Sequence, residues 1–175
     1  MQLADLDPAD LALFDRAREV LAKAHHPRRH QVAAAMLGAS GTVYVGLHLG
    51  SRRINVCAES SALASARIAG EERITTVVAV CLGTAGTAVV TNPCGVCREL
   101  LGSYCPDAMV LVDVRGTVRK ARLAELLPLP WLRSEETGWT VAEPSVAAPS
   151  VAAPSVGERS VGERSVAAPS VEERG

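Results

Sequence analysis

The chain has 175 residues, an apolar content of 48%, an aromatic content of only 3% and a formal net charge of -1. This length accommodates one ordinary domain with additional chain, and the scarcity of aromatic side chains predicts a core of Ala, Val and Leu. A near-neutral charge gives no general attraction to a phosphate backbone, so nucleic acid is not favoured as a partner.

The sequence does not favour export or membrane insertion. The first ten residues are acidic and lack the basic and apolar regions of an export signal, and no apolar run approaches the roughly 20 residues that cross a bilayer. The five cysteines are an odd number, so they cannot all pair within the chain, and thiol or metal-binding roles in a reducing compartment are favoured. We therefore expect a cytoplasmic protein with no membrane partner, in which Cys81 and Cys105 are free thiols.

The first two predicted elements are a helix over residues 8–24 and a hairpin. Asp7 is placed to cap the helix and Pro8 occupies its first position. Apolar residues recur at helical spacing, at Leu11, Phe14 and Leu21. The apolar runs VAAAML and TVYVGLHL then flank the turn-forming sequence GASG, which predicts two antiparallel strands.

Helices and buried strands alternate through the rest of the domain. Small residues and a closing Gly70 predict a buried helix over 57–70, ended by a glycine cap. The β-branched run RITTVVAVCLG predicts a strand covered on both faces. A helix over CGVCRELLGSY, a strand over AMVLVDV, and a short strand followed by a helix in RGTVRKARLAELLPLPW complete the series. This alternation predicts a layered α/β sandwich.

The C-terminal segment has a different composition. From about Glu143 it repeats a five-residue unit, PSVAA with variants, and it contains no apolar residue larger than Val. Recurring Pro with Ser and Ala favours an extended, solvated chain. We therefore expect a working domain over residues 1–133 and a low-complexity, disordered tail over 134–175, with a spacer or docking role as the alternative for the tail.

Three cysteines are candidate metal ligands. Cys94 and Cys97 lie two residues apart at a predicted helix start, and Cys57 opens the preceding helix. Free backbone N–H groups and the positive end of a helix dipole favour the thiolate at such positions. Three protein thiolates leave Zn²⁺ one open position for water, which is typical of a catalytic site. A structural zinc site is the main alternative, because a redox dithiol gives no role to Cys57.

Glu59 is the candidate catalytic residue. It lies two residues after Cys57, so on the first turn of a helix it projects to a different side from that ligand. Its carboxylate can then face a metal-bound water without binding the metal, take a proton from that water, pass it to a ring nitrogen, and later protonate a departing amine. These proton transfers are the chemistry of hydrolytic deamination.

The motifs Cys57-Ala58-Glu59 and Pro93-Cys94-Gly95-Val96-Cys97 resemble the signature of the zinc deaminases. From about residue 32 to residue 131 the chain is similar to the cytidine deaminase superfamily, in its small three-cysteine branch of cytidine and blasticidin S deaminases. The resemblance implies a three-layer α/β/α sandwich with a mixed sheet of about five strands, one Zn²⁺ per subunit, a homotetramer, and deamination at C4.

The substrate implied by the resemblance is a cytosine nucleoside: cytidine, deoxycytidine or an analogue such as blasticidin S, with water as co-substrate and ammonia as product. Two alternatives stay open. One is a deaminase of another aminated heterocycle or of a nucleic-acid base. The other is a zinc-stabilised binding domain without catalysis.

The resemblance also implies roles for residues around the cysteines. The backbone near Ala58 would contact the pyrimidine O2, and the backbone carbonyl of Asn92 would accept from the exocyclic amine. Arg98 would donate to a cysteine sulfur, or else is a solvated helix residue. Trp131 resembles the family's C-terminal aromatic near the pocket, or else has a packing role.

The sequence departs from the cytidine enzymes where they read the sugar. His48 and Gly50 stand where an Asn-x-Glu pair would hold the ribose hydroxyl, so cytidine itself can be a poor substrate. His30 replaces a base-stacking Phe, and His30 and His48 are each either a substrate contact or an ordinary loop or strand residue. Arg52 and Arg53 either bind an acidic substituent, such as the carboxylate of blasticidin S, or are surface arginines.

Overall fold

The computed structural model describes residues 1–133 and Glu136. Met1–Arg133 form one compact unit. The repeat segment and the predicted disordered tail over 134–175 lie outside the described residues apart from Glu136, so the division of the chain into domain and tail stays a prediction.

The first predicted helix is confirmed as α1, Pro8–Ala24. Its N-terminus is fixed by a reciprocal pair of hydrogen bonds. The backbone N–H of Asp10 donates to the Asp7 side chain at 3.1 Å, and the backbone N–H of Asp7 donates to the Asp10 carboxylate at 2.8 Å. Such a capping box satisfies donors that the first turn of a helix leaves without partners.

The predicted mixed sheet is confirmed, with seven strands in place of about five. The strands are β1 (Leu3–Ala4), β2 (Val32–Gly38), β3 (Val43–Leu47), β6 (Ile74–Leu82), β7 (Ala88–Val90), β8 (Met109–Val114) and β9 (Thr117–Arg122). Their order is β1-β9-β8-β6-β2-β3, with β7 paired to β6; β6 and β8 are parallel and the other pairs are antiparallel. The additional strands, β1 and β7, are two and three residues long, too short for a recognisable pattern.

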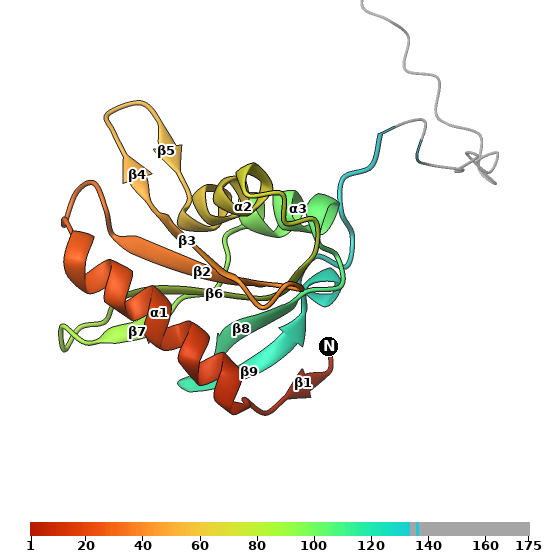
Figure 1. Ribbon diagram of the computed structural model, residues 1–175, viewed down its shortest axis with the longest axis horizontal. Coiled ribbons are helices and arrows are strands. Elements are labelled where there is room, and N and C mark those ends of the chain that lie inside the picture. Colours follow the sequence, from red (N-terminus) through yellow and green to blue (C-terminus); the bar gives the residue numbers. More distant parts are fainter. Residues whose placement is uncertain (134–135, 137–175) are drawn as a thin grey trace, which may run out of the picture. The chain divides into compact units, whose positions relative to one another are not determined.

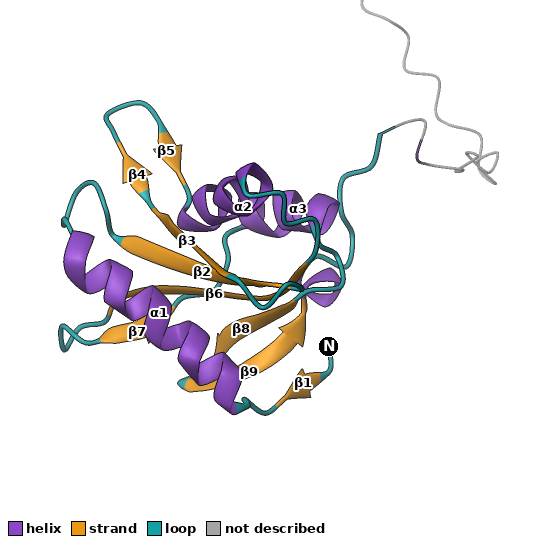
Figure 2. Cartoon of the chain, in the orientation of Figure 1, coloured by secondary structure: helices purple, strands orange, loops and turns teal. Residues whose placement is uncertain are grey.

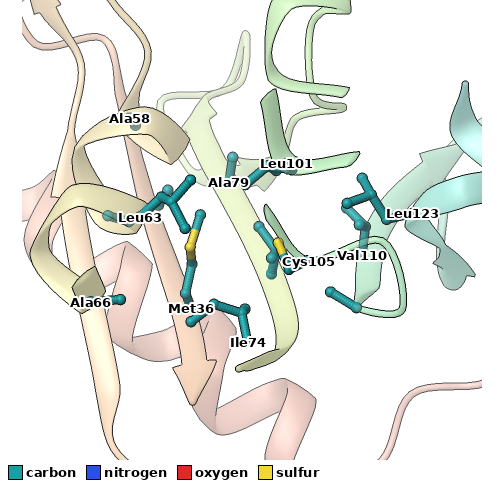
Figure 3. Packing of buried hydrophobic residues seen from close by; sticks show 14 of the residues in the cluster. Met36, Ala58, Leu63, Ala66, Ile74, Ala79, Leu101, Cys105, Val110 and Leu123 are labelled. Atoms are coloured by element: carbon teal, nitrogen blue, oxygen red, sulfur yellow. The ribbon is translucent and has the colours of Figure 1, made fainter. Parts of the chain in front are cut away.

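Helices cover both faces of the sheet, which gives the predicted three layers (Figures 1 and 2). Successive residues of a strand point to opposite faces. One face packs against α1 and includes Ala33, Ala35, Val78 and Val80. The other packs against α2 (Ala58–Ile68) and α3 (Gly95–Tyr104) and includes Ala34, Met36, Val77 and Ala79. Figure 3 shows side chains of the second cluster gathered around the central strand.

Helix α2 lies unusually close to β3, and Gly46 is the reason. A Cβ atom at Gly46 would lie 2.2 Å from both the carbonyl oxygen of Ala58 and the backbone nitrogen of Ala62. The Ser61 hydroxyl donates to the Leu47 carbonyl at 3.0 Å across the same contact. The missing side chain at Gly46, together with the small side chains of α2, therefore allows the helix backbone to lie directly against the strand.

The predicted glycine cap at the end of α2 is confirmed. Gly70 has a φ of +79°, its N–H donates to the Arg67 carbonyl at 3.1 Å, and the N–H of Glu71 donates to Ala66 at 2.9 Å. This is the Schellman arrangement, which needs a left-handed residue that glycine supplies without strain.

The structure differs from the sequence-based expectations at two places. The helix expected near the end of the domain is a single 3-10 turn, Leu123–Leu126, because Pro128 disfavours helical geometry in the residue before it. A second, two-stranded sheet joins β4 (Leu49–Gly50) to β5 (Asn55–Val56) and was not predicted. Among the described residues, no helix has both the length and the apolar character needed to cross a membrane.

Candidate active site

The three candidate ligands come from the N-terminal ends of two helices. Cys57 is the N-cap residue of α2, Cys94 is the N-cap residue of α3, and Cys97 lies in the first turn of α3. Neither N-cap side chain accepts a capping hydrogen bond. Both thiols are therefore available at the positive ends of helix dipoles, where negative charge is stabilised.

The spacing of the sulfur atoms fits a zinc ion. The Sγ atoms of Cys57 and Cys94 are 3.7 Å apart, and the three Sγ atoms all lie within 4.8 Å of one another. Tetrahedral zinc with Zn–S bonds of about 2.3 Å places its sulfur ligands about 3.8 Å apart. No disulfide consumes these thiols. The donor set is therefore suited to Zn²⁺ with one position left for a non-protein ligand.

The electrostatics of the three thiols also point to a cation. Burial raises the pKa of Cys97 far above its usual value, the negative charge of Glu59 adds to the rise, and burial likewise raises the pKa of Cys57. Burial acts in the same direction on Cys94, but hydrogen bonds from the Cys97 backbone and the neighbouring thiols outweigh it and lower the Cys94 pKa. A divalent cation reverses such penalties and deprotonates coordinating thiols.

Glu59 lies buried beside the sulfur atoms. It is 5% exposed, and its charge acts on the pKa of all three cysteines. Within residues 1–133, its carboxylate takes part in no hydrogen bond or ion pair. Buried polar groups are nearly always paired, so a carboxylate without a protein partner is free to bind water or a substrate amine.

The loop before α3 is fixed to the sheet through Asn92. Its side-chain amide donates to the Asp113 carbonyl at 3.0 Å, and its side-chain oxygen accepts from the Asp113 N–H at 2.8 Å. Both polar atoms of the side chain are thus engaged with Asp113, and among the described residues no hydrogen bond uses the Asn92 backbone carbonyl. That carbonyl is the group expected to bind the exocyclic amine.

Arg98 holds the same loop. Its Nε donates to the Pro93 carbonyl at 2.9 Å and its Nη1 to the Leu126 carbonyl at 3.4 Å, and no hydrogen bond to a cysteine sulfur is found in the described part of the chain. Arg98 therefore acts on the backbone directly before Cys94. A contact with sulfur stays a prediction.

The two candidate histidines lie together at the edge of β2 and β3. The His30 Nδ1–H donates to the His48 carbonyl at 2.9 Å, because a carbonyl can only accept, and the His48 Nδ1 accepts from the Gln31 N–H at 3.4 Å. In the neutral forms these bonds leave a His30 Nε2 that accepts and a His48 Nε2 that donates. Both nitrogens remain available to a ligand.

The remaining predicted contacts are spread more widely. Ala58 is fully buried in the first turn of α2, directly between Cys57 and Glu59. Arg52 and Arg53 are exposed at the tip of the β4–β5 hairpin. Trp131 is 70% exposed on the segment that follows the 3-10 turn. The structure thus brings Cys57, Cys94, Cys97 and Glu59 together, while Trp131 presents its ring to the surface of the single chain.

Three clustered cysteine thiols beside a buried carboxylate without a protein partner, on an α/β/α sandwich, are the arrangement of a zinc hydrolase. Comparison with known proteins defines it further: residues 8–113 match the family described as the cytidine and deoxycytidylate deaminase zinc-binding region. The chain belongs to this family. The predicted enzyme class and the Zn²⁺ cofactor are confirmed.

Individual relatives agree with this assignment. The chain is 32% identical to the blasticidin-S deaminase of Bacillus cereus over 140 residues, which cover 77% of this chain and all of the relative. It is 34% identical to the cytidine deaminase of Halalkalibacterium halodurans over 104 residues, or 57% of this chain and 76% of that one. The crystal structure of cytidine deaminase from Mycobacterium tuberculosis superposes with a TM-score of 0.59 at 27% identity, covering 73% of this chain and 100% of that one.

Proposed function

We propose that the protein hydrolyses the C4 amine of a cytosine nucleoside to a carbonyl and releases ammonia. The observation that carries this proposal is the buried Glu59 carboxylate, without a protein partner, beside three sulfurs at zinc-ligand spacing. The names of the relatives, cytidine deaminases and a blasticidin-S deaminase, support a cytosine nucleoside or analogue as substrate.

The catalytic steps assigned to this chain are proton transfers and base binding. Zinc held by Cys57, Cys94 and Cys97 supplies a Lewis acid that makes water nucleophilic at neutral pH. Glu59 takes one proton from the attacking water and passes it to the ring nitrogen. It then takes the remaining proton from the hydroxyl added at C4 and delivers it to the departing amine, which leaves as ammonia. The Asn92 carbonyl accepts from that amine, and the backbone near Ala58 contacts the pyrimidine O2.

Glu59→Gln tests this assignment. The amide keeps the shape of the side chain but cannot take a proton, so we expect kcat to fall by at least about 100-fold while one zinc per chain is retained. Glu99→Gln is the matched control, because Glu99 is exposed on α3 and should be replaced without effect. Ammonia release from cytidine, deoxycytidine and blasticidin S is the assay. Undiminished turnover by Glu59→Gln would contradict the proposal.

We further propose that the substrate carries an acidic substituent. Residues 25–31 and 48–56, called here the cationic loops, contain all four histidines of the chain and Arg28, Arg29, Arg52 and Arg53, with no acidic residue. The loops are joined by a hydrogen bond from the Gly50 N–H to the Arg29 carbonyl at 2.8 Å. Among the described residues, none of the four guanidinium groups is in an ion pair or a hydrogen bond. Unpaired guanidinium groups bind carboxylates and phosphates strongly.

Replacing Arg52 and Arg53 together by Ala tests the substrate class. A charge-assisted hydrogen bond contributes about 1.5–3 kcal/mol, so KM for an acidic substrate should rise at least about tenfold, while KM for neutral cytidine changes little. Blasticidin S supplies the carboxylate and CMP the phosphate, which distinguishes the two anions. Arg18→Ala on α1 is the control. An equal rise for cytidine would contradict this role. His30 and His48 are the proposed neutral contacts of the same region.

We also propose a cytoplasmic homotetramer. Support comes from apolar side chains exposed on the single chain, including Ile68, Val96 and Trp131, and from five cysteines that are all free thiols. Trp131 would then contact a neighbouring subunit. Light scattering after size exclusion should give four times the mass of the chain, and a monomer at micromolar concentration would contradict the assembly.

A further inference from the structure

Arg67, in the last turn of α2, bonds the C-terminal ends of both helices that carry the zinc ligands. Its Nη1 donates to the carbonyls of Glu71 at 3.0 Å and Glu72 at 2.6 Å, in the loop that follows α2. Its Nη2 donates to the carbonyl of Tyr104, the last residue of α3, at 3.1 Å. One planar group thus joins two segments separated by more than thirty positions in the sequence.

The position of this guanidinium is set by those carbonyls. Its Cζ lies 5.5 Å from the centre of the Tyr104 ring, which adds a cation–π contact to the α3 side. Its Nε is buried and has no hydrogen-bond partner among residues 1–133. A buried donor without a partner is destabilising, so the three hydrogen bonds to the carbonyls, and not the solvation of the guanidinium, hold the group in this position.

The two helices need such a link because they rest on different supports. Helix α2 packs chiefly on β2 and β3, whereas α3 packs against the 3-10 turn and has few direct contacts with α2. The cation also lies at the negative end of both helix dipoles. The opposite ends of the same helices carry Cys57, Cys94 and Cys97.

We propose that Arg67 is a positioning residue of the zinc centre, fixing the relative orientation of α2 and α3 and thereby the separation of their sulfur ligands. Ten residues separate Cys57 from Arg67, or about 15 Å of helix at 1.5 Å per residue. A tilt of about 4° over that length moves Cys57 by about 1 Å. Since the Cys57–Cys94 sulfur distance is 3.7 Å, such a shift takes the ligands out of tetrahedral range.

The test compares zinc binding by Arg67→Met and Arg67→Lys with that by Asp10→Asn. Methionine keeps an apolar stem and loses all three hydrogen bonds, while lysine keeps the charge and can reach fewer carbonyls. Asp10→Asn is the control for lost stability, because it weakens a buried ion pair with Lys120 on the opposite face of the sheet. Zinc affinity is measured by competition with a chromophoric chelator, and ligand geometry by the visible spectrum of the cobalt-substituted protein.

We expect Arg67→Met to weaken zinc binding at least about tenfold and to broaden the cobalt spectrum well below the melting temperature. Arg67→Lys should weaken it by a smaller factor, and it carries the test alone if Arg67→Met does not fold. At saturating zinc, kcat should fall while KM stays within twofold. Asp10→Asn should lower the melting temperature but leave zinc affinity within twofold.

The inference is overturned if the Arg67 variants bind zinc as tightly as the wild type, or if Asp10→Asn weakens binding equally. It rests on the proposed zinc-dependent function, but the metal readouts do not require turnover. A wild-type protein that binds zinc and releases no ammonia would defeat the proposed reaction and leave this test intact.

Discussion

Gly46→Ala should separate α2 from the sheet and damage the metal site without touching a ligand. The added Cβ would lie 2.2 Å from the Ala58 oxygen and the Ala62 nitrogen and 2.8 Å from the Ala62 Cα. All three are backbone atoms, so no side-chain rotation relieves the clash. Because Cβ contacts below 3.0 Å are essentially never seen, the helix and the strand must move apart by at least 0.8 Å.

That displacement sets the size of the effect. Overpacking a tight contact costs about 1–3 kcal/mol, and a rigid backbone obstacle favours the upper end. At roughly 3 °C per kcal/mol for a domain of this size, the melting temperature should fall by about 9 °C. Helix α2 carries Cys57 and Glu59, and a misplacement of about 1 Å at a catalytic centre can cost about 100-fold in rate.

The assay is thermal unfolding with and without zinc, followed by ammonia release from the better substrate of the panel. Gly102→Ala is the matched control: it lies within α3, its Cβ would meet nothing within 4 Å, and alanine there should leave stability unchanged or raise it by up to about 1 kcal/mol. A Gly46→Ala protein with wild-type melting temperature and zinc affinity would refute the account of how α2 is seated.

Three further outcomes are expected. Lys120→Met leaves the buried Asp10 carboxylate without its cation, at a cost of about 3 kcal/mol at neutral pH. Lys120 also lowers the pKa of Asp7 in the folded protein, and the stability that this provides is lost as the pH falls through that pKa. The difference in melting temperature between Lys120→Met and the wild type should therefore shrink between pH 6 and pH 3. In zinc-free protein at pH 8, iodoacetamide should modify Cys94, whose pKa is lowered, before the buried Cys105, whose pKa is raised to about 11 by burial. Zinc should protect Cys94 and leave the reactivity of Cys105 unchanged; peptide mapping that finds Cys105 alkylated first would contradict this. Chelation of zinc present at a thousandfold excess over its Kd should remove about 4 kcal/mol of stability, seen in denaturant unfolding as a lower midpoint.

The fold was predictable wherever one element is long enough to show a period or a cap. The 8–24 helix has its cap and stripe in the sequence, and the run over residues 74–82 is apolar on both faces because helices cover both sides of β6. The β4–β5 hairpin was missed since each strand has two residues and its hydrogen bonds depend on a turn built around Ser51. Pro128, in contrast, is a helix-terminating residue visible in the sequence, and it limits the last helix to one turn.

The site was predictable to the extent that its groups are adjacent in a motif. The two motifs place three sulfurs and one carboxylate at the N-terminal ends of two helices. The only long-range information needed is that these two helix ends lie next to each other in the fold. The supporting contacts are different. The Arg67 side chain donates to the backbone carbonyl of Tyr104, and the backbone N–H of Asp113 donates to the Asn92 side chain. Each contact joins distant segments through a backbone group, so the spacing of side chains in the sequence does not predict it. Gly46 did offer a signal, because an isolated glycine inside a strand often marks close backbone approach.

The β4–β5 hairpin pairs with itself and takes no place in the strand order of the main sheet. Changes of length or sequence at its tip therefore break no hydrogen bond of the sheet that supports the cysteine-bearing helices. The hairpin tip can therefore change, in evolution or in a mutant library, and alter which substrates bind, while the cysteines and Glu59 keep their positions.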